Sequence, residues 1–105
     1  MKSETLAIVI LNWNDCKSTL ECLKSILQET SDSAIIKNKL CTIYVVDNNS
    51  NDGSKDVLKR WSKEGNIKYE QNIVYIQSDK NLGYAGGNNL ALRRSYAADV
   101  DYYMV

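Results

Sequence analysis

Four short apolar segments divide the chain, at residues 6–11, 41–46, 73–76 and 102–105. Each segment is rich in β-branched or aromatic residues, and none alternates between polar and apolar positions as a half-exposed strand would. Such segments are typical of strands in a parallel sheet that is covered on both faces. The pattern therefore predicts four buried, parallel strands.

The stretches between these strands carry apolar residues at helical spacing. The first holds an apolar stripe of four residues, Cys16, Leu20, Leu23 and Leu27. Asp15, which precedes the stripe, is a candidate N-cap. A second helix is expected from about Ser54, with Gly65 as its stop signal, and a third over about residues 84–97. Strands and helices then alternate along the chain, which predicts an α/β three-layer sandwich with right-handed crossovers.

The length of the chain favours a single domain. A chain of 105 residues and 11.9 kDa supports one hydrophobic core and not a second domain with its own. The fourth predicted strand reaches Val105 with no turn residue or covering helix after it, whereas a parallel strand inside a sheet is followed by a crossover connection. We therefore expect residues 1–105 to be one domain, truncated after its fourth strand, of a longer protein.

Composition and charge exclude several functions. Thirteen basic and thirteen acidic residues balance, so no basic excess is available to neutralise the phosphates of a nucleic acid. The chain has no histidine, which removes Ser-His-Asp, Cys-His and His-metal chemistry within it. No apolar stretch is long enough to span a bilayer, and no signal-peptide pattern opens the chain. Three cysteines without a CxxC spacing predict reduced thiols in a cytoplasmic protein and make a redox function a weak alternative.

Asparagines gather behind three of the predicted strands. Eight of the eleven follow a strand directly, namely Asn12, Asn14, Asn48, Asn49, Asn51, Asn81, Asn88 and Asn89. The carboxyl ends of parallel strands share one edge of the sheet, and α/β folds bind ligands at that edge. The alternative is that asparagine favours turns, left-handed backbone positions and helix caps, which would explain any one of the eight.

Four acidic residues are candidates for functional groups. Asp47 ends the second strand, where its carboxylate is suited to accept the ring N–H of uracil or thymine, which cytosine lacks. The alternative for Asp47 is a helix cap or a loop brace. Asp52 lies in a turn-and-cap sequence and is assigned to structure. The pair Asp99 and Asp101 precedes the fourth strand, at the edge opposite the asparagines, and is rejected as a metal site.

The sequence Asn-Leu-Gly-Tyr-Ala-Gly-Gly-Asn-Asn at residues 81–89 opens the third predicted helix. Its adjacent glycines, Gly86 and Gly87, each cost about 1 kcal/mol relative to alanine in a helix. This cost predicts that a ligand or another backbone approaches closely there. Free N–H groups at the helix start would also favour a phosphate or a sugar hydroxyl. The spacing fits neither a dinucleotide fingerprint nor a P-loop.

Together, the motifs at residues 8–14, 45–54 and 81–89 resemble glycosyltransferase family 2, and within it the bacterial rhamnosyltransferase-like branch. The resemblance covers residues 6–105 and implies a GT-A, Rossmann-like fold whose N-terminal half binds a nucleotide-sugar donor. It implies that Asn12 and Asn14 border the nucleoside and that Asp47 holds the pyrimidine ring. The nucleotide-sugar site that we expect comprises Asn12, Asn14, Asp47, Asn49, Asn81, Gly83, Gly86, Gly87 and Asn88. Asn48 stands where many relatives carry a second carboxylate.

The resemblance also implies that the groups for sugar transfer follow later in the family. An Asp-x-Asp-like motif after the fourth strand would hold Mg²⁺ or Mn²⁺ against the diphosphate, and the general base and acceptor site come after it. We therefore expect no catalytic and no metal-binding residue in this chain. The expected parent is an inverting hexosyl- or rhamnosyltransferase that uses a UDP- or dTDP-sugar and a saccharide or lipid-linked saccharide acceptor in bacterial polysaccharide synthesis. We expect it in the cytoplasm or at the inner face of the membrane.

An alternative from another class stays open. The chain would then be a complete, non-catalytic α/β nucleotide-binding or regulatory module that acts through a partner surface. Its exposed fourth strand would offer a template for pairing with a second copy.

Overall fold

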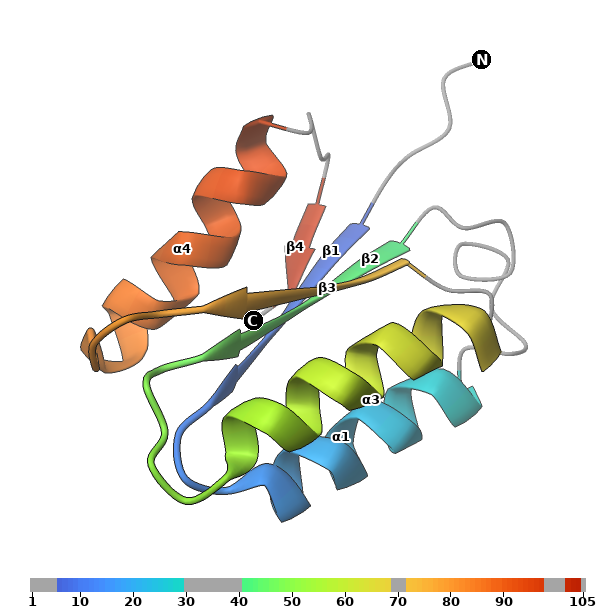
Figure 1. Cartoon of the computed structure of the whole chain (residues 1–105). Helices are drawn as coiled ribbons and strands as arrows, with labels where there is room; N and C mark the ends of the chain where they lie inside the picture. The colour runs from blue at the N-terminus through green and yellow to red at the C-terminus, as the bar shows by residue number, and fades with distance from the viewer. Residues whose placement is uncertain (1–5, 30–40, 69–71, 98–101, 105) are drawn as a thin grey trace.

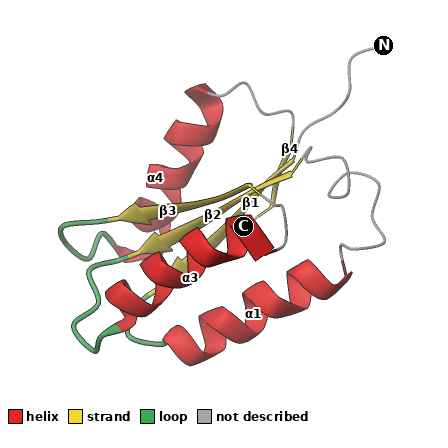
Figure 2. Cartoon of the chain, turned by 45° about the vertical axis from the view of Figure 1, so that its right-hand side comes forward, coloured by secondary structure: helices red, strands yellow, loops and turns green. Residues whose placement is uncertain are grey.

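The computed structural model describes residues 6–29, 41–68, 72–97 and 102–104. Strands and helices alternate in the order β1 (Leu6–Asn12), α1 (Cys16–Glu29), β2 (Cys41–Asp47), α3 (Ser54–Lys68), β3 (Asn72–Gln77), α4 (Gly83–Ala97) and β4 (Tyr102–Met104). The strands form one parallel sheet in the order β3-β2-β1-β4. Helices α1 and α3 cover one face of this sheet and α4 covers the other (Figure 1). Figure 2 shows the three layers from a second direction. The predicted α/β three-layer sandwich is confirmed.

Two apolar layers fill the spaces between the sheet and its helices. The layer under α1 and α3 consists of Ile8, Leu23, Leu27, Cys41, Ile43, Val45, Leu58 and Ile73. The layer under α4 consists of Ala7, Val9, Tyr44, Val46 and Ala91. Neighbouring residues of each strand enter opposite layers, as the two-residue repeat of a strand requires. Burial on both faces explains why the strands read as continuous apolar runs.

The strand register aligns three polar residues at the carboxyl edge of the sheet. Asn12 lies opposite Asp47 across β1 and β2, and Asp47 lies opposite Gln77 across β2 and β3. Each is an even number of residues from a residue of the layer under α1 and α3, so all three side chains point to that face. The parallel register therefore brings together residues that are far apart in the sequence.

The start of α1 follows the sequence prediction. The carboxylate Oδ1 of Asp15 accepts a hydrogen bond from the backbone N–H of Ser18 at 3.3 Å, which is the geometry of an N-cap. The predicted stripe contributes Leu23 and Leu27 to the buried layer, with Cys16 and Leu20 packed against it. No helix in the described parts of the chain is both long and apolar enough to cross a membrane.

The predicted end of the second helix at Gly65 is wrong. Helix α3 continues to Lys68, and Gly65 is buried against β3. A methyl group added at Gly65 would lie 2.9 Å from Cδ1 of Ile73. The glycine therefore serves close packing of the helix on the sheet. Asn66 reinforces that contact, because its side chain accepts from the N–H of Ile73 at 2.5 Å and donates to its carbonyl at 2.9 Å.

Strand β4 forms one edge of the described sheet and pairs with Leu6–Ile8 of β1. Val105 lies outside the described residues. Pairing of this edge with a second copy stays a prediction.

The three thiols differ in their exposure. Cys41 is buried, and burial raises the pKa of its thiol to about 11, whereas Cys22 is exposed. We therefore expect a thiol reagent at pH 8 to label Cys22 within minutes and Cys41 only as fast as the chain opens. Peptide mass spectrometry after timed labelling checks this order. Equal labelling rates for the two residues in the folded chain would contradict it.

Candidate functional site

The loops that follow β1, β2 and β3 meet at one edge of the molecule (Figure 1). Asp47 stands at the centre of this edge with 0% of its surface exposed. Its Oδ1 accepts hydrogen bonds from Asn12 Nδ2 at 2.9 Å and from Ser50 Oγ at 2.6 Å. Its Oδ2 accepts from the Ser50 backbone N–H at 2.9 Å and from Gln77 Nε2 at 3.0 Å. Four donors therefore surround this carboxylate.

The donors decide the charge state of Asp47. Burial on its own would raise the pKa of this carboxyl, because it penalises the charged form. The hydrogen bonds from Ser50, Asn12 and Gln77 outweigh burial and hold the pKa below its ordinary value. Asp47 is thus a buried carboxylate that stays ionised at neutral pH.

Asn12 links Asp47 to α1. Its side chain is 1% exposed, and its Oδ1 accepts a hydrogen bond from the hydroxyl of Thr19 at 2.6 Å. Because Thr19 can donate to the oxygen and not to the amino group, it turns the Asn12 amino group toward Asp47. Asn12 is therefore part of the support of the carboxylate. Thr19 carries no signal in the sequence that marks it as a site residue.

Ser50 connects the loops behind β1 and β2. Its hydroxyl accepts from the backbone N–H of Asn14 at 2.8 Å and from Asn12 Nδ2 at 3.2 Å, while it donates to Asp47. The residue is 2% exposed. Ser50 lies within the motif at residues 45–54 but was not predicted as a site residue. Its importance depends on its place beside Asp47, which only the folded loop defines.

Asn14 and Asn49 both have a left-handed backbone, with φ angles of 50° and 64°. Asparagine adopts this conformation more readily than most residues, so the turn preference explains part of the asparagine pattern. Their side chains nevertheless take part in the site. Asn14 Oδ1 accepts from the Asn51 backbone N–H at 2.8 Å, and Asn49 Oδ1 accepts from Lys55 Nζ at 2.8 Å.

Asn48 joins the end of β2 to the segment before α4. Its Nδ2 donates to Asn81 Oδ1 and to the carbonyl oxygen of Gly83, both at 3.0 Å. Its Oδ1 accepts from the backbone N–H of Leu82 at 2.9 Å. Only an amide offers both a donor and an acceptor here, since a carboxylate would have no hydrogen for Asn81 and Gly83. This arrangement is a physical reason for asparagine at position 48.

The glycines allow α4 to begin close to the sheet. Gly83 has a φ of 74°, which favours glycine. A methyl group at Gly86 would lie 2.7 Å from Cβ of Leu82, and one at Gly87 would lie 2.5 Å from Cδ1 of Leu11. The close approach predicted from the double glycine is therefore present. The close neighbours are the side chains of Leu82 and Leu11, and Asn48 Nδ2 lies 3.2 Å from the methyl group added at Gly87. The approach of a ligand to these glycines stays a prediction.

Asn88 carries a buried polar atom without a partner. The residue is 5% exposed, and its Oδ1 has no hydrogen-bond donor within the described part of the chain. An unsatisfied buried acceptor costs about 1–3 kcal/mol, so such an atom in a folded protein calls for an explanation. A ligand that donates a hydrogen bond would supply one.

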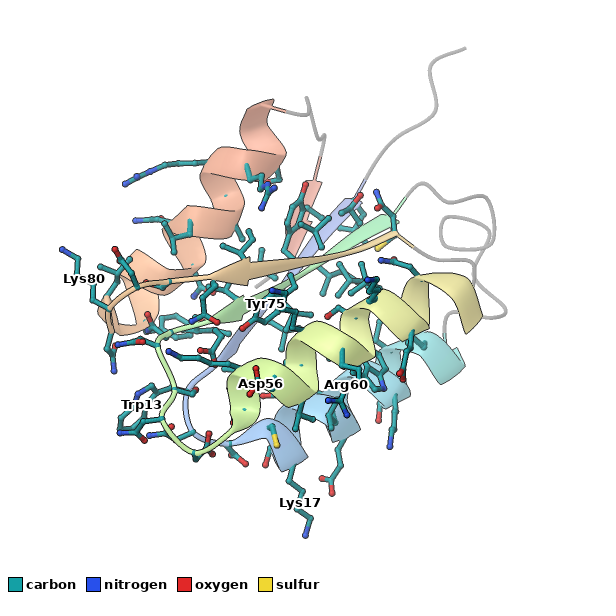
Figure 3. All side chains as sticks on the ribbon, in the orientation of Figure 1. Trp13, Lys17, Asp56, Arg60, Tyr75 and Lys80 are labelled. Atoms are coloured by element: carbon teal, nitrogen blue, oxygen red, sulfur yellow. The ribbon has the colours of Figure 1, made fainter. Side chains whose placement is uncertain are left out.

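Exposed aromatic residues flank this edge. Trp13 is 54% exposed and Tyr84 is 70% exposed, and Figure 3 shows Trp13 and Lys80 projecting outward at the loop edge.

An open pocket of about 330 Å³ lies against the end of β1 and the start of α1, lined by Ile10, Leu11, Trp13, Asp15, Ser18, Thr19 and Cys22. It shares only Thr19 with the hydrogen-bond network of Asp47.

The described residues do not fit a divalent cation. No group of three or more acidic or cysteine side chains comes together among them. The two carboxylate oxygens of Asp47 already accept hydrogen bonds from four N–H and O–H groups, so they are not free to bind a cation. Asp52 caps α3 as expected, because its Oδ1 accepts from the Ser54 N–H at 3.0 Å. Asp99 and Asp101 lie outside the described residues.

The predicted site residues thus form two groups. Asn12, Asn14 and Asp47 meet through Ser50, while Asn81, Gly83 and Gly87 meet at Asn48. Asp47 and Asn48 are adjacent, so the two groups meet at the end of β2. Asn49 adjoins them in the loop, and Asn88 lies in the first turns of α4.

Comparison with known proteins supports the fold. The structure of a mannosyltransferase from Pyrobaculum calidifontis, solved in complex with GDP-Man and Mn²⁺, is similar to this chain with a TM-score of 0.64 at 17% identity. The match covers 89% of this chain and 25% of that one. Because the neighbour is a GT-A glycosyltransferase, the predicted GT-A fold is confirmed.

Sequence comparison supports the family. A teichoic acid poly(glycerol phosphate) polymerase from Staphylococcus epidermidis is 32% identical over 100 residues, which are 94% of this chain and 12% of that protein. The chain therefore spans only a small part of the relatives that it matches. The model of the family described as glycosyl transferase family 2 matches residues 7–103. On this evidence the chain belongs to glycosyl transferase family 2.

Proposed function

We propose that this chain is the donor-binding part of an inverting glycosyltransferase and binds a uridine or thymidine diphosphate sugar at the carboxyl edge of its sheet. The observation that supports this most is the meeting of both polar groups at the end of β2, beside the ionised Asp47. Parallel α/β folds bind ligands at this edge.

The buried and the exposed site residues have different roles in this proposal: the buried ones support the loops, and the exposed ones contact the ligand. Asn12 and Asp47 are buried and hold the loops in place. Asn49 is half-buried, and Asn81 and Gly83 are exposed, so these residues are available to a ligand. The start of α4 adds the favourable end of a helix dipole for a diphosphate. In this proposal the base lies near Asp47 and the diphosphate near Gly83 and Gly86.

The proposal gives this chain donor binding and no transfer step. Its described residues contain no cluster of three or more side chains that could hold a metal ion. The chain also has no histidine that could act as a general base. A divalent cation, Mg²⁺ or Mn²⁺, belongs to the proposed complete enzyme, where it would stabilise the leaving diphosphate. The Mn²⁺ in the Pyrobaculum mannosyltransferase supports this part of the proposal.

The proposed parent transfers a hexosyl or rhamnosyl group to a saccharide or lipid-linked saccharide acceptor in a bacterial polysaccharide. The similarity to a teichoic acid polymerase supports a role in making a cell-surface polymer. We place this reaction in the cytoplasm or at the inner face of the membrane, where nucleotide sugars would be at hand.

A nucleotide titration tests the proposal. Amide resonances of the ¹⁵N-labelled chain are followed while UDP, dTDP, CDP or GDP is added to millimolar concentration. We expect shifts at Asn14, Asn49 and Gly83 with UDP and dTDP. The absence of shifts at this edge with any of the four nucleotides would refute donor binding by this chain.

Asn88 gives a separate prediction. Asn88→Leu removes the unpartnered carbonyl and is expected to raise the free energy of unfolding by about 1 kcal/mol. The same change is expected to weaken UDP binding, because it removes the Asn88 carbonyl oxygen, which in this proposal accepts a hydrogen bond from the ligand. Urea unfolding and the titration above measure the two effects.

The matched control is Asn89→Leu, a change at the exposed neighbouring residue. It is expected to leave both quantities nearly unchanged. A less stable Asn88→Leu chain with normal UDP affinity would show that Asn88 is satisfied within the protein.

A further inference from the structure

The four hydrogen bonds to Asp47 differ in how readily they can be exchanged. Three of them come from two residues that are nearly inaccessible, Asn12 at 1% and Ser50 at 2% exposure. The fourth comes from Gln77, whose side chain is exposed at the end of β3. Strand β3 is the outer strand of the described sheet on this side. Gln77 is therefore the one donor to Asp47 that can move into solvent without disturbing the core.

The orientation of the Gln77 amide is fixed by its neighbours. Its Oε1 accepts a hydrogen bond from the hydroxyl of Tyr75, and its Nε2 donates to the carbonyl of Ser78 at 2.8 Å as well as to Asp47. Burial and the negative charges of Asp47 and Asp56 raise the pKa of the Tyr75 hydroxyl, so it remains a donor at neutral pH. Gln77 consequently presents an N–H, and not its oxygen, to Asp47.

An N–H from the base of a nucleotide would have the same chemistry as the Gln77 amide. A carboxylate accepts hydrogen bonds only, so Asp47 can receive a ring N–H but cannot pair with an unprotonated ring nitrogen. Uracil and thymine carry such an N–H, and cytosine does not. With both Asp47 oxygens already occupied, a base must displace a donor, and Gln77 is the accessible one.

We propose that Gln77 is a specificity-determining residue that occupies, in the free protein, the position on Asp47 Oδ2 that the ring N–H of the bound base takes. This inference rests on the proposed donor binding. In the free chain the Gln77 amide satisfies the buried carboxylate. When a nucleotide with a ring N–H binds, the amide swings toward solvent and the carboxylate keeps four donors. A base without that N–H would leave Asp47 short of one donor, so it cannot replace Gln77 at equal cost.

The first test is a change in UDP affinity. Gln77→Met keeps the length of the side chain and removes the amide that the base must displace. We expect Gln77→Met to bind UDP about threefold to tenfold more tightly than the unchanged chain, which corresponds to one net hydrogen bond. CDP affinity is expected to change less, so the preference for UDP over CDP should increase. Isothermal titration or the amide shifts give both affinities.

The second test follows the Gln77 amide directly. The side-chain NH₂ resonances of Gln77 are assigned by their loss in Gln77→Met. We expect UDP to move them toward the values of a solvent-exposed glutamine, and CDP to leave them in place. Tyr75→Phe frees Oε1 of Gln77 and should increase UDP affinity in the same direction, by a smaller factor.

Asn72→Met is the matched control. Asn72 is exposed at the opposite end of the same strand, and its side chain donates to the Thr42 hydroxyl at 3.0 Å. Its replacement removes a surface hydrogen bond of β3 away from Asp47. We expect unchanged affinities for UDP and CDP.

The outcomes separate this inference from the proposed function. If UDP shifts the amides of Asn14 and Gly83 but leaves the Gln77 NH₂ signals in place, donor binding stands and the inference is wrong. Weaker UDP binding by Gln77→Met would also overturn it, because Gln77 would then contact the ligand or brace the site. If UDP produces no shifts at all, the proposed function fails first.

Discussion

Asn48→Asp is expected to lower the free energy of unfolding at pH 7 by about 3 kcal/mol, although the two side chains have nearly the same shape. The change removes the donor to Asn81 and Gly83 and brings a negative oxygen to within about 3 Å of two acceptor oxygens. Asn48 is 2% exposed, so the new carboxylate oxygen is buried without a donor, and a buried polar group without a partner costs about 1–3 kcal/mol, and more when it is charged. A domain of this size has about 5–15 kcal/mol to lose.

Asn49→Asp is the matched control for this change. It makes the same substitution at the next residue, where the oxygen already accepts from the Lys55 ammonium group. A carboxylate is compatible with that partner and with the left-handed backbone. Urea unfolding of both variants should therefore show a large loss for Asn48→Asp and almost none for Asn49→Asp. Equal losses would mean that the contacts of Asn48 with the segment before α4 contribute little.

The pH dependence of Asn48→Asp provides a further check. Protonation restores a donor and removes the negative charge, so the folded state favours the protonated form of the new carboxyl group. Such a group lends stability below its unfolded pKa and loses it as the pH rises. The deficit of Asn48→Asp should therefore be smaller near pH 4 than at pH 7. A deficit that grows on acidification would contradict the explanation.

The strands and helices could be predicted from the sequence because both sheet faces are covered. Continuous apolar runs, separated by stretches with helical periodicity, leave few other folds. The sequence predicts a helix end at Gly65 because a glycine near the end of an apolar pattern usually marks the end of a helix. Here Gly65 lies in the last turn of α3, and close packing against Ile73 leaves no room for a side chain although the helix continues to Lys68. A local pattern cannot separate these two causes.

The candidate site was predictable only in part. Asp47 and the asparagines were found because they directly follow apolar strands, a position that the sequence shows. Thr19, Ser50 and Gln77 were not found, because a hydroxyl or an amide gains its role from the carboxylate that it faces. The Asn12–Asp47 contact joins residues 35 positions apart and depends on strand register. Register is set by the whole sheet and by no single motif.

The prediction for Asp47 follows from the same network. Asp47→Asn is expected to lower the free energy of unfolding at pH 7 by about 3 kcal/mol. Four donors surround position 47, and the NH₂ group of the new asparagine is itself a donor, so it cannot accept the hydrogen bonds that the replaced oxygen accepted. The variant should also bind UDP more weakly, since the proposed acceptor for the base has lost its charge.

The stability difference between the original chain and Asp47→Asn is expected to depend on pH. The folded state holds the pKa of Asp47 below its ordinary value, so the carboxylate contributes its stability above the unfolded pKa, about 3.9. That contribution is lost as the pH falls through the lower, folded pKa. The gap between the original chain and Asp47→Asn should therefore be full at pH 7 and narrow below about pH 4.

Asp52→Asn is the control, because Asp52 is an exposed carboxylate in the same loop whose pKa is also lowered, by hydrogen bonds from Ser54. Solvent screens an exposed group, so its replacement should change stability far less than that of Asp47. Urea unfolding at pH 7 and pH 3 measures both differences. A gap for Asp47→Asn that stayed constant between these two pH values would mean that the four donors do not hold Asp47 in its ionised form. The carboxylate would then be no fixed acceptor for a base, and the proposed donor site would lose its centre.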